Sequence, residues 1–139
     1  MATVSYGMKI TSAFHIFDKT IEIYRDAIKY LTNIVSENYF DISCISDETS
    51  TVTQRLRRQY VEKLVHSTKN NEAVYPSFDK MFYKFPSYLR RDAITTAIGL
   101  ISSHKSQVKN WEDKNRVGRR PHLNLNQNTF PCFYRKTLI

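Results

Sequence analysis

The sequence has few cysteines and few glycines, and each shortage excludes a class of site. Only Cys44 and Cys132 are present and they form no CxxC pair, so we expect neither a disulfide framework nor a zinc site built on cysteine spacing. The three glycines form no P-loop and no GxGxxG motif that could cradle a phosphate. No apolar run reaches the length of about 18 residues that crosses a membrane. Residues 1–10, MATVSYGMKI, lack the layout of a signal peptide, and a reducing cytoplasm is the expected location.

The sequence also lacks the patterns of catalytic and metal-binding sites. The C-terminal part contains only Asp92, Glu112 and Asp113 as acids, which is too few to presume a two-metal nuclease site. The four histidines show neither H-x3-H nor HExxH spacing. Cys44 has no recognisable base partner that would make its thiol a nucleophile. We therefore expect no catalytic residue, no metal and no cofactor, and a chain that binds rather than cuts.

Charge is the strongest feature that the sequence does have. The chain carries a net charge of +8 over 139 residues. Residues 1–83 contain 10 Lys and Arg against 10 Asp and Glu, whereas residues 84–139 contain 11 against 3 and hold the whole excess. A charge excess confined to one part of a chain is typical of a polyanion partner on that part. The charge pattern therefore favours nucleic-acid binding.

Hydrophobic periodicity predicts a strand and then helices in the first part of the chain. Apolar and polar residues alternate over 3–10, which predicts a half-buried strand. Apolar residues then recur at steps of four and three over 17–37, which predicts a helix. A T-x-x-Q pattern at 51–54 has the spacing of a capping box and precedes a helical pattern over about 52–66. The aromatic segment 76–85 is expected to plug a small core.

The second part of the chain predicts one more long helix and then strands. A helix is expected over about 88–112, and Gly99 in its interior indicates close approach of another backbone, since glycine is costly there. Leucines alternate with asparagines over 123–125, and Phe130, Cys132 and Tyr134 resume a strand pattern. Pro131 is then expected at an edge or a bulge.

These elements predict an α+β fold that is predominantly helical. A helical bundle is inserted between the strands of a small, incomplete β-barrel or sheet. The expected boundaries are a first strand within 1–14, the helical insertion over 15–113 and the returning strands over 114–139. Two or three strands do not close a barrel, and an open apolar edge promotes unwanted pairing. We therefore expect the chain to be the first part of something longer.

The stretch KFPSYLRRDAI, residues 84–94, places two arginines at the start of the last long helix. A helix N-terminus carries positive partial charge and disfavours cations. Arg90 and Arg91 are therefore either on a solvated helix face or in contact with a phosphate partner.

Residues 75–113 resemble the N-terminal part of TnpB-type proteins, which are transposon-encoded relatives of the compact type V CRISPR nucleases and are often called transposases. The resemblance rests on Phe78-Asp79-Lys80, on KFPSYLRR at 84–91, on the Ala- and Ile-rich helix that follows and on NWE at 110–112. The following GRRPHLNL and FPCFYRK segments resemble the family's return into its sheet, so the resemblance is specific over residues 75–136. In the first 66 residues only the order of elements matches.

The resemblance implies a β-barrel wedge domain interrupted by a helical recognition domain. In that family a RuvC-like nuclease domain with a zinc-binding insert follows, but its carboxylates and cysteines are absent from this sequence. The implied function is the nucleic-acid-binding part of an RNA-guided DNA endonuclease that grips a guide RNA and target DNA. Nuclease activity is not carried over to this chain.

The resemblance and the charge together imply a set of residues that contact nucleic acid. Arg90, Arg91 and Tyr88 would contact phosphates or bases near the first turn of the helix. The full expected set is Lys84, Tyr88, Arg90, Arg91, Lys105, Lys109, Arg116, Arg119, Arg120, Arg135 and Lys136.

Two other hypotheses remain open at this point. The chain could be a stand-alone accessory or regulator that binds RNA or DNA without cutting, and such a protein would be stable and monodisperse alone. It could instead be a protein-interaction module whose basic half meets an acidic protein. Binding that is insensitive to nuclease treatment would distinguish this last hypothesis from the others.

Overall fold

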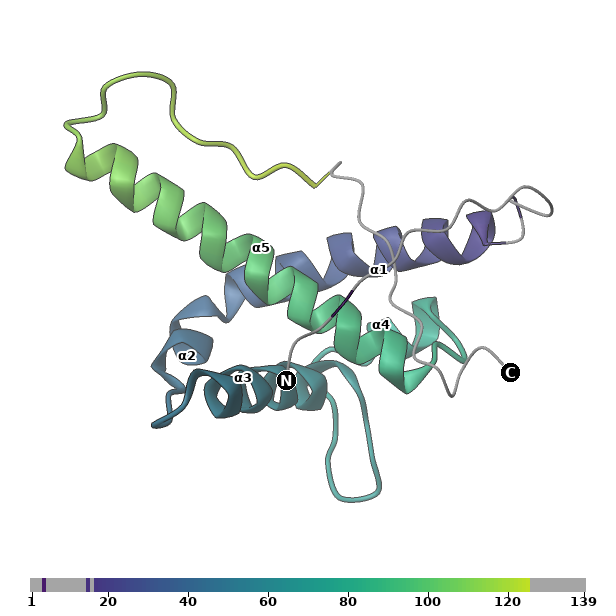
Figure 1. Cartoon of the computed structure of the whole chain (residues 1–139). Helices are drawn as coiled ribbons and strands as arrows, with labels where there is room; N and C mark the ends of the chain where they lie inside the picture. The colour runs from purple at the N-terminus through teal and green to yellow at the C-terminus, as the bar shows by residue number, and fades with distance from the viewer. Residues whose placement is uncertain (1–3, 5–14, 16, 126–139) are drawn as a thin grey trace.

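Five helices form the structure, a computed structural model that describes residues 4, 15 and 17–125 (Figure 1). In chain order they are α1 (Asp18–Glu37), α2 (Tyr39–Cys44), α3 (Ser50–Val65), α4 (Ser77–Met81) and α5 (Ser87–Asp113). Figure 1 shows α5 crossing α1, with α3 and α4 near the N-terminal half of α5. No helix in this part of the chain is long and apolar enough to cross a membrane.

The crossing of α1 and α5 forms the centre of the core. Apolar residues of α1 recur at helical spacing and bury one face, with Leu31 and Val35 fully inaccessible to solvent. The facing stripe of α5 includes Ala93 and Ala97, whose small side chains allow the two helices to approach closely. At one end of this contact the Tyr24 hydroxyl donates a hydrogen bond of 2.6 Å to the Asp92 carboxylate. The tyrosine therefore buries its ring while its polar atom remains satisfied.

A cluster of aromatic rings joins α4 to the core. The Phe78 and Phe82 centroids lie 5.0 Å apart, and Phe85 lies 6.0 Å from Phe78 in an edge-to-face arrangement. Tyr30 of α1 packs on the same rings. The predicted aromatic plug is thus confirmed, except that the Met81 side chain points outward and is 62% exposed.

The cap of α3 differs from the sequence prediction. Thr49 is the N-cap, and its hydroxyl accepts a hydrogen bond of 3.3 Å from the Val52 amide. The predicted capping box at 51–54 is therefore wrong by two residues, because Thr51 already lies inside the helix that begins at Ser50. Thr49 and Thr51 both precede the apolar residues of the helix, but only a cap at Thr49 allows the helix to begin at Ser50.

The prediction of an α+β fold with an incomplete β-barrel or sheet is wrong. The described residues contain helices and no strand, and their only β-type pairing is an isolated bridge between Thr68 and Asn71. Leu123 and Leu125 lie in an irregular segment, where Leu123 packs against the edge of the core instead of joining a ladder. The predicted strands at 3–10 and 130–134 fall almost wholly outside the described residues.

No described residue closely approaches the interior glycine of α5. A Cβ built on Gly99 meets nothing within 4 Å among the described residues, so the predicted approach of another backbone is wrong for this part of the chain. Gly99→Ala should therefore raise the free energy of unfolding by about 0.5–1 kcal/mol, because alanine has the higher helix propensity and loses less backbone entropy on folding. Urea denaturation measures this difference. An unchanged or lowered stability would show that something outside the described residues packs against this position.

Candidate nucleic-acid interface

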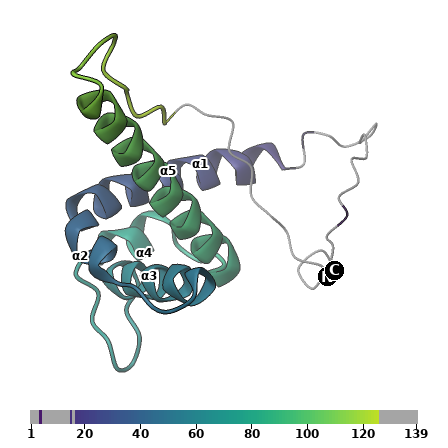
Figure 2. The same ribbon diagram turned by 60° about the vertical axis from the view of Figure 1, so that its left-hand side comes forward.

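The two halves of α5 have different surroundings. The buried residues of this helix all lie between Leu89 and Ile101, and none follows Ile101. Figures 1 and 2 both show the C-terminal half of α5 rising away from α3 and α4. We call residues 102–120 the distal basic segment, because they contain six Lys and Arg against two acids. The cations are Lys105, Lys109, Lys114, Arg116, Arg119 and Arg120.

A tight turn ends α5 and reverses the direction of the chain. The amide of Asn115 bonds the Glu112 carbonyl at 3.0 Å, and the amide of Arg116 bonds the Trp111 carbonyl at 3.0 Å. Asn115, Arg116 and Gly118 adopt left-handed backbone conformations, with φ of 58°, 60° and 85°. In C-terminal capping turns, residues in this conformation let the following backbone N–H groups donate hydrogen bonds to the last carbonyls of the helix. The C-terminal part of the distal basic segment is therefore an ordered turn that reverses the chain after α5.

Trp111 fastens this turn from the side. Its indole Nε1 donates a hydrogen bond of 3.1 Å to the Gly118 carbonyl. The Arg116 guanidinium lies over the indole ring, 5.9 Å from its centroid, in a cation–π contact. Beyond the turn the chain runs back along α5, where the His104 ring nitrogen Nε2 lies 3.3 Å from the Pro121 carbonyl oxygen. These contacts hold the turn and the returning chain against the helix.

The cations of the distal basic segment are available to a partner. All six are exposed. Among the residues that the structure describes, none of the six takes part in a salt bridge. Lys105 and Arg116 make cation–π contacts, with the Lys105 ammonium 5.7 Å from the centroid of the Tyr39 ring. The segment therefore presents positive charge that the described part of the protein does not neutralise.

The other predicted contact residues lie at the opposite end of α5. This helix has 27 residues and is about 40 Å long. Arg90 is buried and donates from Nη2 to Glu62 Oε1 at 3.0 Å, and Arg91 donates from Nε to the same oxygen at 3.4 Å. Lys84, in the link before α5, has a φ of 58° and places its ammonium 5.5 Å from the Tyr83 ring centroid. Tyr88 is half-buried against the core.

The structure thus divides the predicted residues into two groups. Lys105, Lys109, Arg116, Arg119 and Arg120 come together in the distal basic segment, and Lys84, Tyr88, Arg90 and Arg91 lie at the start of α5. Arg135 and Lys136 lie outside the described residues.

Sequence reasoning missed two residues that belong to these groups. Lys114 is exposed at the turn beside Arg116, and its place in the run DKNRVGRR was signal enough to include it. Glu62 binds both arginines from α3. It is 28 residues from Arg90 in sequence, and no spacing rule connects the two.

The described residues offer little that could hold a metal ion, since no group of three or more His, Cys, Asp and Glu side chains lies close together among them.

The profile of the Aq_aa04 family matches residues 2–139. The chain belongs to the Aq_aa04 family. No curated protein and no solved structure matches the chain. The family description names neither an activity nor a ligand, so it leaves the TnpB resemblance as a prediction.

Proposed function

We propose that this protein binds nucleic acid, with the distal basic segment gripping the phosphodiester backbone. The observation that supports this function is a run of six exposed cations on one ordered helix end and turn, free of salt bridges within the described chain. Phosphate contacts from lysine and arginine supply most of the sequence-independent affinity of nucleic-acid-binding proteins.

The geometry of the turn supports backbone contact over base reading. Arg116 is held on the Trp111 ring, and Gly118 is held by the Trp111 indole, so the neighbouring cations extend from a fixed platform. A fixed platform limits the entropy that is lost when side chains are ordered on binding. Four of the six cations follow the end of α5 at Asp113, on irregular backbone that is neither a helix nor a ribbon for a major groove. This placement favours contact with a single strand or an RNA surface.

A narrower form of the proposal follows from the TnpB resemblance. The distal basic segment includes NWE and GRR, two of the pieces on which that resemblance rests. In this form the nucleic acid is a guide RNA together with target DNA, and base pairing by the guide supplies the sequence choice. Its distinguishing result is one discrete RNA that co-purifies with the protein from a host carrying the native flanking DNA.

Direct titration tests the broader proposal. A fluorescent single-stranded RNA of about 20 nucleotides is titrated with the protein at several salt concentrations, and fluorescence anisotropy gives the affinity. If about five side chains meet phosphates of this single strand, log K against log salt should have a slope of about −3.5. Absence of binding at low salt would overturn the proposal. Binding of an acidic protein that persists after nuclease treatment, with no RNA affinity, would support a protein-interaction module instead.

A further inference from the structure

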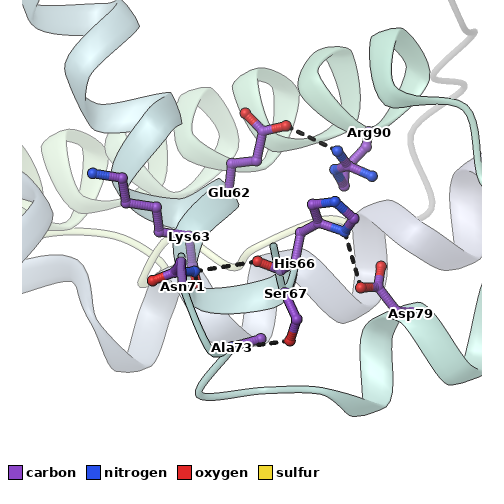
Figure 3. Close-up of polar contacts among 8 residues, drawn as sticks. All are labelled: Glu62, Lys63, His66, Ser67, Asn71, Ala73, Asp79 and Arg90. Carbon is purple, nitrogen blue, oxygen red and sulfur yellow. Dashed lines mark hydrogen bonds and ion pairs between the residues drawn. The ribbon is translucent and has the colours of Figure 1, made fainter. Parts of the chain in front are cut away.

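A polar groove lies between α3 and the N-terminal half of α5, at the far end of α5 from the distal basic segment. It has a volume of about 500 Å³, and Glu62, Lys63, His66, Arg90 and Arg91 are among the residues that line it. This volume falls within the range of roughly 300–1,000 Å³ that small-molecule sites occupy. Figure 3 shows Glu62 and His66 on α3 and its following loop, facing Arg90 of α5.

Hydrogen-bond donors exceed acceptors in this groove. Each guanidinium carries five N–H donors and no acceptor. Among the described residues, the guanidinium groups of Arg90 and Arg91 share one salt-bridge acceptor, Glu62 Oε1. This oxygen accepts from Arg90 at 3.0 Å and from Arg91 at 3.4 Å. The Arg90 side chain is only 8% exposed, and its buried Nε atom has no hydrogen-bond partner among the described residues. A buried donor without an acceptor is costly, so the groove favours a ligand that brings further acceptors.

The other acid near the groove is already occupied. Asp79 Oδ2 lies 2.9 Å from His66 Nδ1, and this pair holds the imidazole ring in place. In Figure 3 the His66 ring lies between Asp79 and the Arg90 guanidinium. The carboxylate of Asp79 is therefore directed to the histidine, and Glu62 alone faces the two positive charges of Arg90 and Arg91.

We propose that this groove binds a phosphate group through Arg90 and Arg91. The oxygens of a phosphate group would supply the acceptors that the two guanidinium forks lack, in the geometry that arginine forms with phosphate. The negative charge of the ligand would balance the arginine charge that Glu62 leaves uncompensated. The site is separate from the proposed function, because it uses other residues at the other end of α5.

Titration with inorganic phosphate tests the site on the whole protein. The ¹⁵N–¹H signals of the arginine Nε–H groups are followed as phosphate replaces chloride at constant ionic strength. We expect saturable shifts of the Arg90 and Arg91 signals, and Arg91→Gln should weaken the apparent affinity about tenfold by removing one charge-assisted partner. Arg55→Gln removes the same charge from an exposed position outside both the groove and the distal basic segment and should leave phosphate affinity unchanged. Equal weakening by both variants, or no saturable shift, would overturn the proposal.

A second variant, which should strengthen phosphate binding instead of weakening it, tests whether the arginines have only a structural role. Glu62→Gln keeps an oxygen that accepts a hydrogen bond but removes the charge that competes with phosphate. We expect phosphate to bind this variant about tenfold more tightly and to raise its Tm more than that of the unaltered protein. Because phosphate also stabilises proteins generally, an equal rise of Tm in the unaltered protein, Glu62→Gln and Arg91→Gln would contradict the site.

Two further ligands identify the source of the phosphate group. A nucleoside 5′-monophosphate that shifts the same signals, without competition from RNA, would assign the groove to a free nucleotide. A 5′-phosphorylated RNA that competes with inorganic phosphate, where the same RNA with a 5′-hydroxyl does not, would assign it to an RNA end. Both results support a phosphate site. Competition by neither ligand, together with weak and non-saturable phosphate shifts, would overturn it.

Discussion

Replacing Lys109, Lys114, Arg119 and Arg120 together with glutamine should weaken RNA binding about 100-fold at physiological salt. Each cation that meets a phosphate on a single strand contributes about −0.7 to the slope of log K against log salt, so the slope should flatten by about 3 units. All four side chains are exposed, and none forms a salt bridge within the described chain, so their removal should leave the fold intact. Anisotropy titrations at four or five salt concentrations give both quantities.

The matched control removes the same amount of charge elsewhere. Lys29, Arg55, Lys69 and Lys80 are also exposed, and they lie outside the distal basic segment. Their replacement by glutamine should change RNA affinity only through the net charge, with a much smaller change of slope. An equal loss of affinity and slope in the two variants would mean that RNA senses the total charge of the protein and not a defined surface.

Glu62→Ala should be among the most destabilising substitutions in the chain. It would leave the Arg90 guanidinium buried without its carboxylate, and the two side chains are only 8% and 16% exposed. Breaking a buried pair by removing one partner costs about 3–5 kcal/mol, which is a large fraction of the 5–15 kcal/mol by which domains are stable. Urea denaturation followed by far-ultraviolet circular dichroism measures the change.

Arg91→Ala is the comparison for that prediction. Its side chain is 53% exposed and contacts the same Glu62 oxygen at 3.4 Å, so its loss should cost less than about 1 kcal/mol. A cost for Glu62→Ala similar to that of Arg91→Ala would show that Arg90 finds water or another acceptor when the carboxylate is gone. In that case the pair would not anchor α3 to α5.

The long helices could be predicted from the sequence, because their apolar residues repeat with the period of an amphipathic helix. The pattern over 17–37 corresponds to α1, and the pattern over 88–112 corresponds to α5, within one residue at most of the ends. Packing against one central partner reinforces this period, since α1 and α5 bury facing stripes. Local pattern and tertiary contact therefore agree for these helices.

The same kind of reasoning did not predict that the described residues would lack a sheet. Leu123 and Leu125 alternate with asparagines as they would in a strand, but an extended segment that lies along a helix satisfies the same pattern. Alternation over so few residues does not say whether a neighbouring strand exists. The His104 contact with the Pro121 carbonyl, which holds the segment to α5, depends on a residue 17 positions away and has no signal in the sequence.

The candidate interface could be predicted in part, because most of its residues are neighbours in the sequence. The cations of the distal basic segment are close in sequence, so their proximity in space follows from one helix and one turn. The two arginines at the start of α5 raised the choice between a solvated face and a phosphate partner. The structure adds a third answer that the sequence could not supply, because Arg90 is buried against Glu62 of another helix.

Ultraviolet crosslinking of the protein to single-stranded RNA, followed by mass spectrometry of the crosslinked peptides, tests the central claim most directly. The proposed function predicts that crosslinks concentrate in peptides spanning the distal basic segment, with Trp111 as the aromatic residue at its centre, and that they diminish in the four-glutamine variant of that segment. Crosslinks confined to the exposed Tyr83 and Phe40, or spread evenly over the chain, would contradict it.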